Sequence, residues 1–160
     1  MFMTWLWFIV GCTQEKEETT NLESPLGEWV GLEKDGMLFP IILEGEIAQN
    51  EFEDAELQRS VQTVLLDLID DGTGTLTSTF VMTNIDESTY DFSFSVPMTI
   101  DISEEPYLLQ AYDAEIDEEL NLECYQTEAG FLSCTYTSNI ESGTGTLNFI
   151  REEVIGSMLQ

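Results

Sequence analysis

Apolar and polar residues alternate with a period of two along most of the chain beyond residue 26. The clearest stretch covers residues 92–102, where every second position is apolar: Phe92, Phe94, Val96, Met98, Ile100 and Ile102. This alternation is typical of a β-strand that buries one face. Pro97 lies on the polar side and has no amide hydrogen, so we expect a bulge or a sheet edge near it.

Eight other segments show strand patterns of the same kind, at residues 27–33, 39–47, 64–68, 76–82, 107–116, 120–126, 131–138 and 144–151. Helical periodicity is scarce, and the best helical candidate is the short acidic segment 51–59. About nine strands joined by short turns predict an all-β fold, either an antiparallel barrel of about 8–9 strands or a two-sheet β-sandwich.

Two features at the ends of this region favour the barrel. Gly27 and Trp29 form a Gly-x-Trp in the first strand, and Arg151 shares a face with Leu147 and Phe149 in the last. This pair resembles the lipocalin-like barrels, in which a Gly-x-Trp packs near an arginine of the last strand. The resemblance implies a barrel closed at one end by Trp29 and Arg151. The strand pattern alone leaves the sandwich open as the alternative.

The N-terminal segment differs from the rest of the chain. Residues 2–10 are apolar but shorter than the roughly 20 residues that span a bilayer, and they fit the apolar region of a signal peptide, although no Lys or Arg precedes them. The run from Ile9 to Cys12 resembles a bacterial lipobox. That resemblance implies acylation of the Cys12 thiol and removal of the preceding peptide. Two or more acyl chains on Cys12 would attach the protein stably to a membrane.

The lipobox resemblance implies three parts of the chain. Residues 1–11 are expected to be a signal peptide, 12–25 a lipidated polar tether, and 26–160 the β-barrel domain. The expected location is the cell envelope. Thr13 follows the cysteine where Asp would favour the inner membrane, so the outer membrane is preferred.

The three cysteines of the chain fit the same interpretation. If Cys12 carries lipid, Cys124 and Cys134 remain, and they flank a turn near Ala129. In a hairpin centred there, the two thiols would face each other across the ladder, which suits a disulfide in an oxidising compartment. A zinc site is disfavoured because the chain has no histidine.

The charge of the chain limits its partners. It has 32 Asp and Glu against four Lys and Arg, a net charge of −28. Such a chain does not bind nucleic acid, which requires a basic surface. Partners are therefore expected among cations, basic proteins and neutral ligands, while most of the charge is interpreted as a solvated surface.

Candidate chemistry is sparse. Without histidine there is no Ser–His or Cys–His pair, and no pair of carboxylates stands out, so we expect no catalytic residue, no cofactor and no enzyme. Asp67, Asp70 and Asp71 lie close to Gly72 and are weak calcium candidates. Their spacing does not match an EF-hand loop, and Asp-Gly is ordinary turn chemistry, so a metal site is not expected.

The phenylalanines leave two functions open. Phe39, Phe80, Phe92, Phe94, Phe131 and Phe149 could line a cavity or fill a core. An empty cavity would favour a lipoprotein that binds a small apolar ligand. A filled core with an exposed aromatic patch would favour a structural or protein-interaction lipoprotein. The sequence does not identify a protein partner.

Overall fold

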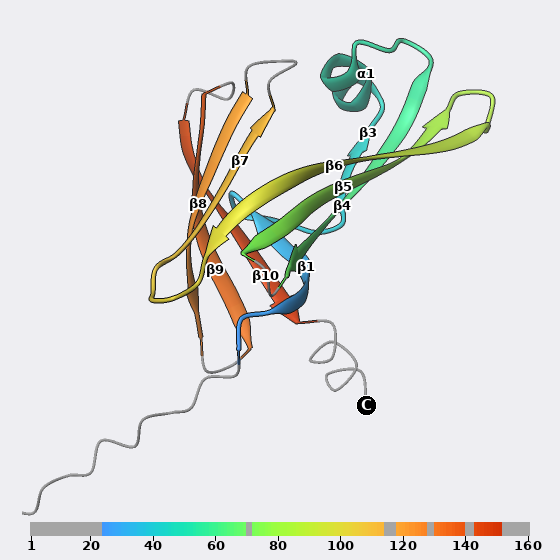
Figure 1. Cartoon of the computed structure of the whole chain (residues 1–160). Coiled ribbons are helices and arrows are strands. Elements are labelled where there is room, and N and C mark those ends of the chain that lie inside the picture. Colours follow the sequence, from blue (N-terminus) through green and yellow to red (C-terminus); the bar gives the residue numbers. More distant parts are fainter. Residues whose placement is uncertain (1–23, 70–71, 114–117, 128–129, 140–142, 152–160) are drawn as a thin grey trace, which may run out of the picture.

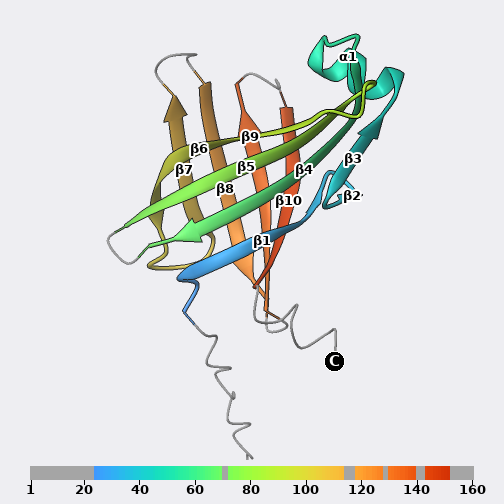
Figure 2. The same ribbon diagram turned by 90° about the vertical axis from the view of Figure 1, so that its right-hand side faces the viewer.

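The described part of the chain folds into a closed antiparallel β-barrel with one short helix (Figures 1 and 2). The computed structural model describes residues 24–69, 72–113, 118–127, 130–139 and 143–151. Its elements are β1 (Gly27–Lys34), β2 (Met37–Leu38), β3 (Ile41–Glu44), α1 (Glu46–Phe52), β4 (Leu57–Leu68), β5 (Thr73–Asn84), β6 (Thr89–Asp101), β7 (Tyr107–Asp113), β8 (Glu118–Gln126), β9 (Phe131–Ser138) and β10 (Gly143–Arg151).

Eight strands form the wall of the barrel. They pair in the order β1-β10-β9-β8-β7-β6-β5-β4, and β4 pairs again with β1. Trp29 of β1 shows the closure directly, because it lies opposite Arg151 of β10 and also opposite Leu66 of β4. The predicted all-β barrel is therefore confirmed, and the two-sheet sandwich was the wrong alternative. Strands β2 and β3 lie outside the closed ring.

The lower half of the barrel, where β1 begins and β10 ends, is filled with side chains. Alternating apolar residues from seven of the eight wall strands, all except β5, meet there, as their period of two requires. Those that fill it are Trp29, Leu66, Leu68, Met98, Ile100, Tyr107, Leu109, Leu122, Cys124, Leu132, Cys134 and Phe149, each less than 9% exposed. This close packing makes the lower half the main hydrophobic core.

Three long strands extend beyond the upper end of the barrel. β4, β5 and β6 have 12, 12 and 13 residues, and their upper parts form a flap that carries α1 (Figure 1). One edge of the flap is covered, because β3 pairs with β4 from Gln62 to Arg59. The other edge is open: β6 pairs with β7 only from Met98 to Asp101. Residues 89–97 of β6 therefore have β5 as their one neighbouring strand within the described chain.

Pro97 lies where β6 separates from β7. The Ile100 amide donates to the Gly72 carbonyl, and the Asn84 amide donates to the Ser88 carbonyl, both at 2.9 Å. The backbone N–H and C=O groups of even-numbered residues in β6 therefore point towards β5. Those of odd-numbered residues, including the Pro97 nitrogen, point towards the opposite edge of the strand. The expectation of an edge near Pro97 agrees with this arrangement, because its missing amide hydrogen removes no bond to β5.

The predicted helix was misplaced. The helix α1 ends at Phe52, and Leu57 already belongs to β4, so the expectation of a helix over 51–59 was wrong. Gly45 and Glu53, with φ of 55° and 52°, bend the chain at the two ends of α1. Leu57 is fully buried against Ala48, which explains why β4 begins there. Among the described residues, no helix has the length and apolar character needed to cross a membrane.

Candidate functional site

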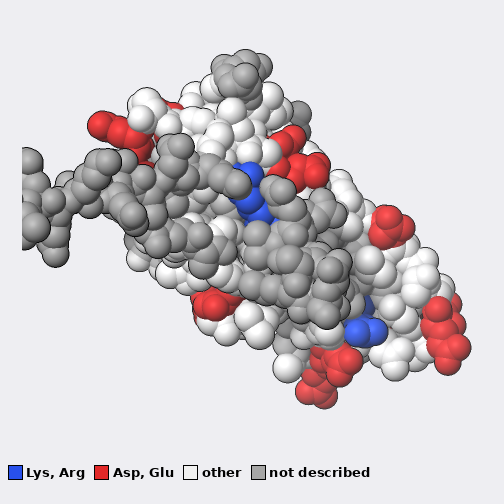
Figure 3. All heavy atoms as spheres, turned by 90° about the horizontal axis from the view of Figure 1, so that it is seen from below, with Lys and Arg blue, Asp and Glu red and all other residues white. Residues whose placement is uncertain are grey.

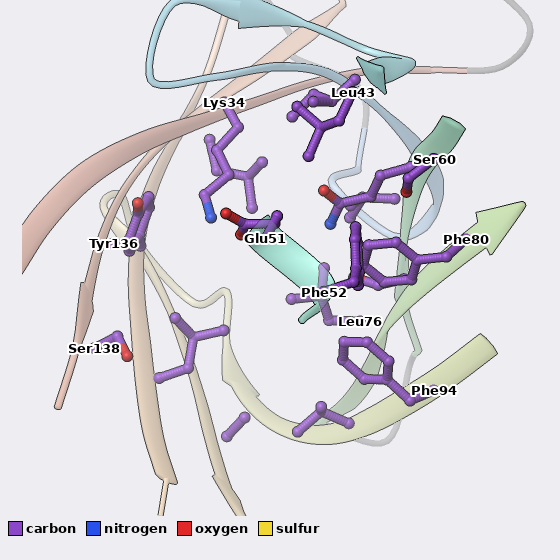
Figure 4. A pocket seen from close by; sticks show the side chains of 18 residues that line it. Lys34, Leu43, Glu51, Phe52, Ser60, Leu76, Phe80, Phe94, Tyr136 and Ser138 are labelled. Atoms are coloured by element: carbon purple, nitrogen blue, oxygen red, sulfur yellow. The ribbon is translucent and has the colours of Figure 1, made fainter. Parts of the chain in front are cut away.

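A cavity of about 320 Å³ occupies the upper half of the barrel (Figure 4). Every wall strand contributes to its lining, together with β3 and α1. The lining residues are Lys34, Ile41, Leu43, Glu51, Phe52, Ser60, Gln62, Val64, Leu76, Ser78, Phe80, Phe94, Val96, Ala111, Leu120, Tyr136, Ser138 and Leu147. The volume lies at the lower end of the roughly 300–1,000 Å³ typical of small-molecule sites. The upper half can therefore hold one small ligand.

One wall of the cavity is aromatic. Phe80 of β5 stacks on Phe92 and Phe94 of β6, with ring centroids 5.0 and 6.0 Å apart, and Phe52 of α1 meets Phe80 edge to face at 5.7 Å. Phe92 and Phe94 are 41% and 50% exposed. The rings therefore form a continuous apolar surface that starts inside the cavity and extends onto the open edge of the flap. We call these four residues the aromatic wall.

The opposite wall is polar. Lys34 of β1 places its ammonium 5.5 Å from the centroid of the Tyr136 ring. The Tyr136 hydroxyl donates to Asp35 at 2.7 Å, and the Thr146 amide donates to the other carboxylate oxygen at 2.8 Å. These two bonds, the Tyr136 one first, hold the pKa of Asp35 below its ordinary value. Figure 4 shows Lys34 and Tyr136 across the cavity from the labelled phenylalanines, with Glu51 between them.

Gly145 allows this polar wall to form. A β-carbon at position 145 would lie 2.5 Å from Cζ of Tyr136 and would also collide with the Asp35 carboxylate. Contacts this close do not occur between real side chains, so a larger residue would displace the Asp35–Tyr136 bond. Gly145 thus has a packing role beside the cavity.

The two residues expected to close the barrel lie together at its lower end. The Arg151 guanidinium lies 4.6 Å from the centroid of the Trp29 ring. The Trp29 indole donates to the Pro25 carbonyl at 2.8 Å, and Arg151 donates to the carbonyls of Leu26 and Ser24. Together they hold the segment that enters β1 across the lower end of the barrel, away from the cavity.

The predicted disulfide is present. Cys124 of β8 lies opposite Cys134 of β9, with 4.0 Å between their α-carbons and an S–S bond of 2.04 Å. Both cysteines are buried in the lower half. The bond therefore cross-links two wall strands below the cavity and does not reach its lining.

The predicted phenylalanines divide between the two halves. Phe149 is fully buried in the lower core, whereas Phe80 and Phe94 line the cavity and Phe92 continues their stack. Phe39 packs on the main core next to Gly31, and Phe131 is partly buried on β9. Phenylalanines thus line the cavity in the upper half and pack in the core in the lower half.

The sequence did not indicate several lining residues. Lys34, Glu51 and Ser78 stand in segments with no motif, and their roles depend on how far β1, α1 and β5 extend past the barrel. Tyr136 follows the alternation of Leu132 and Cys134, which was the available signal that its side chain points inward.

Acidic side chains are dispersed on the surface. Seen from below, Figure 3 shows acidic groups scattered around the described surface with few basic groups among them. Arg59, another of the four basic residues, forms an exposed ion pair with Glu44 at 3.7 Å. This distribution agrees with the interpretation of the charge as a solvated surface.

The calcium and lipid predictions lie mainly outside the described residues. Asp70 and Asp71 are not described, and Asp67 lies in β4 opposite Thr75. No group of three or more acidic or thiol side chains suited to a metal occurs in the described part of the chain. Cys12, the signal segment and most of the tether precede residue 24 and are likewise not described.

No protein-family model, curated protein or solved structure matches this chain. Its function is therefore inferred from the side chains of the cavity and from the charge of the whole chain.

Proposed function

We propose that this protein is a lipid-anchored, non-enzymatic protein of the cell envelope that binds one small apolar ligand in the upper half of its barrel. The cavity of about 320 Å³ carries this proposal. It is lined mainly by apolar side chains, a few polar groups converge on it, and it lies directly above a filled core. That combination is typical of small-molecule binding sites.

The membrane attachment rests on the resemblance of residues 9–12 to a lipobox. Acyl chains on Cys12 would hold the acidic barrel at a membrane whose anionic surface repels it. We place the protein in the outer membrane because Thr13, not Asp, follows the cysteine.

The absence of histidine supports a binding role over catalysis. The acidic side chain among the lining residues is Glu51, and catalysis by paired carboxylates needs a second one within the same site. We therefore assign the lining residues to binding and propose no catalytic residue.

Fluorescence titration of the full chain with the neutral probe N-phenyl-1-naphthylamine tests ligand binding. We expect saturable binding of one probe per chain. Ala111→Leu, which places a larger side chain in the cavity, should reduce the affinity at least tenfold. The control Leu108→Ala removes an exposed side chain from the same strand and should leave affinity unchanged. Binding that is absent, or equal in wild type and Ala111→Leu, would contradict the proposal.

Detergent partitioning tests the anchor separately. In a bacterium that processes lipoproteins, we expect the wild-type protein to enter the detergent phase and the membrane fraction, and Cys12→Ser to remain in the aqueous phase. If Cys12→Ser still partitions into detergent, the lipobox interpretation is wrong.

A protein-interaction role is the second candidate, because Phe92 and Phe94 are exposed beside the open edge of β6. An exposed aromatic patch of this kind is a common feature of interaction sites. A photo-cross-linking residue at Ser95 should then capture one discrete partner in the native host, and Phe92→Ser should abolish the product. A product that persists in Phe92→Ser would contradict this role for the patch.

A further inference from the structure

The two walls of the cavity differ in what they offer to a charged ligand. The polar wall carries Lys34, and Glu51 extends from α1 between the walls (Figure 4). These are the two ionised side chains in the lining, and their charges are opposite. To a first approximation they cancel, so the sign preference of the cavity depends on other groups.

The aromatic wall supplies such a preference. The face of an aromatic ring is electrostatically negative and attracts a cation within about 6 Å of the ring centroid. Phe52 meets Phe80 at an interplanar angle of 78°, and Phe94 lies nearly parallel to Phe80 at 17°. Rings in two orientations therefore border the same space. Their attraction for a cation corresponds to about a 2- to 30-fold gain in affinity, depending on how far the cation is desolvated.

The two ionised side chains differ in their surroundings. The Lys34 ammonium already lies over the Tyr136 ring, and the carboxylate of its neighbour Asp35, which lies outside the lining, accepts a hydrogen bond from the Tyr136 hydroxyl. Within the described residues, the Glu51 carboxylate takes part in no ion pair and no side-chain hydrogen bond. A cation that enters between the walls can therefore approach Glu51, whereas an anion would have to compete with groups that already surround Lys34.

The net charge of the chain acts in the same direction. With 32 acidic and four basic residues, the protein concentrates cations near its surface and repels anions. At physiological ionic strength, salt limits the range of this electrostatic attraction to about 8 Å. The net charge therefore mainly raises the rate at which a cation meets the protein. Where they border the cavity, the aromatic wall and Glu51 determine the preference.

We propose that the ligand is an apolar cation, an alkylated ammonium group carried on a short hydrocarbon chain. The ammonium would lie between Glu51 and the rings of Phe52 and Phe94. The hydrocarbon would lie against the aliphatic lining, which includes Leu76, Val96 and Leu147. This assignment rests on the proposed ligand-binding function and specifies its chemical class.

Three probes with the same alkyl chain and different head groups test the assignment. Decyltrimethylammonium, decanol and decyl sulfate are titrated below their micellar concentrations against N-phenyl-1-naphthylamine bound to the full chain, in 0.15 M salt. We expect decyltrimethylammonium to displace the probe with at least tenfold higher affinity than decanol, and decyl sulfate to bind most weakly. Far-UV circular dichroism checks that the barrel stays folded with each probe.

Variants show whether the preference for a cation comes from residues of the cavity or from the acidic surface. Glu51→Gln and Phe94→Leu should each lower the affinity for decyltrimethylammonium by about 3- to 10-fold and change that for decanol less than twofold. The control Glu46→Gln removes an exposed carboxylate from the same helix, outside the lining, and should change neither affinity. Ala111→Leu retains every carboxylate and should lower the affinity for all three probes.

The outcomes distinguish the two proposals. If decanol binds as tightly as decyltrimethylammonium, or decyl sulfate binds most tightly, the cationic assignment is wrong and the binding function stands. If Glu46→Gln lowers the affinity as much as Glu51→Gln, the preference belongs to the general acidic surface and the assignment is again wrong. If no probe binds to the wild type, both proposals fail.

Discussion

The same alternation of apolar and polar residues produces a filled core in the lower half of the barrel and a cavity in the upper half. In the lower half, buried inward side chains from seven of the eight wall strands pack together, a disulfide cross-links β8 to β9, and Arg151 lies over Trp29 at the end of the barrel. In the upper half, β6 separates from β7, and β4, β5 and β6 continue upwards as the flap. The inward side chains at this level therefore surround a cavity. The close packing therefore lies in the lower half, and the space for the proposed ligand lies in the upper half.

This difference explains why small residues occur where they do. Ser60, Ser78 and Ala111 point inward at the level of the cavity and are buried, yet they leave room beside them. At the level of the core, β4 carries Leu68 and β7 carries Leu109, which are larger than Ser60 and Ala111 of the same strands. Along β4 and β7, the change from small to large inward residues thus marks the boundary between the cavity and the core.

A matched pair on β8 should show the largest effect. Leu122 is 1% exposed in the lower core, and Leu120, two residues earlier on the same face, lines the cavity. Leu122→Ala should reduce the free energy of unfolding by about 2–5 kcal/mol, because it leaves a void among packed neighbours. Leu120→Ala should cost less than about 1.5 kcal/mol, because its side chain already borders empty space. Urea denaturation measures both, and equal losses would remove the distinction between the halves.

Removal of the disulfide should have the next largest effect. Replacing Cys124 and Cys134 together by Ala should lower the free energy of unfolding by about 2–3 kcal/mol, as expected for a bond that closes a loop of this length. Because the bond lies below the cavity, affinity for N-phenyl-1-naphthylamine should change less than twofold in the folded variant. A large loss of affinity would show that the two halves are coupled.

Substitutions that enlarge a side chain should also cost more stability in the lower half than in the upper half. In the lower half, a β-carbon at Gly74 would lie 2.8 Å from the Asp67 carbonyl oxygen, so Gly74→Ala should cost about 1–3 kcal/mol. In the upper half, Ala111→Leu adds more atoms but places them in the cavity, and its cost should stay below about 1 kcal/mol. Thermal and urea unfolding of the two variants give the comparison. The reverse order of costs would mean that the cavity is filled in solution.

The smallest expected effect concerns pH and the polar wall. The pKa of Asp35 is lowered in the folded state, so the stability it contributes is present above the unfolded pKa of about 3.9 and is lost as the pH falls through the lower folded value. Asp35→Asn should cost less than about 1 kcal/mol near neutral pH, because the group is exposed and screened. The difference between the wild type and the variant should disappear in strongly acidic solution. A difference that grows on acidification would contradict the assigned direction.

Much of the lower half follows from the sequence. The alternation of Leu132, Cys134 and Tyr136 against Leu120, Leu122 and Cys124 determines which side chains face inward, and this places the disulfide correctly. These features depend on the local period of two and on a nearby turn, which can be read along one hairpin.

The upper half depends on information that no local pattern contains. The cavity exists because β6 pairs with β7 over four residues while it pairs with β5 over eleven, and pairing lengths are set between distant segments. Pro97 was the local sign of an edge, but it did not reveal how far the strands separate. The position of α1 was missed for a similar reason, since Gly45 and the burial of Leu57 outweigh the weak helical pattern of 51–59.

The division between a filled and an open half is tested most directly by methyl NMR. The full chain, with labelled Leu and Val methyl groups, is titrated with N-phenyl-1-naphthylamine. We expect saturable shifts at Leu76, Val96, Leu120 and Leu147 in the upper half, and little change at Leu66, Leu109 and Leu122 in the lower half. Shifts spread equally over both halves, or saturable shifts confined to the lower half, would contradict the account.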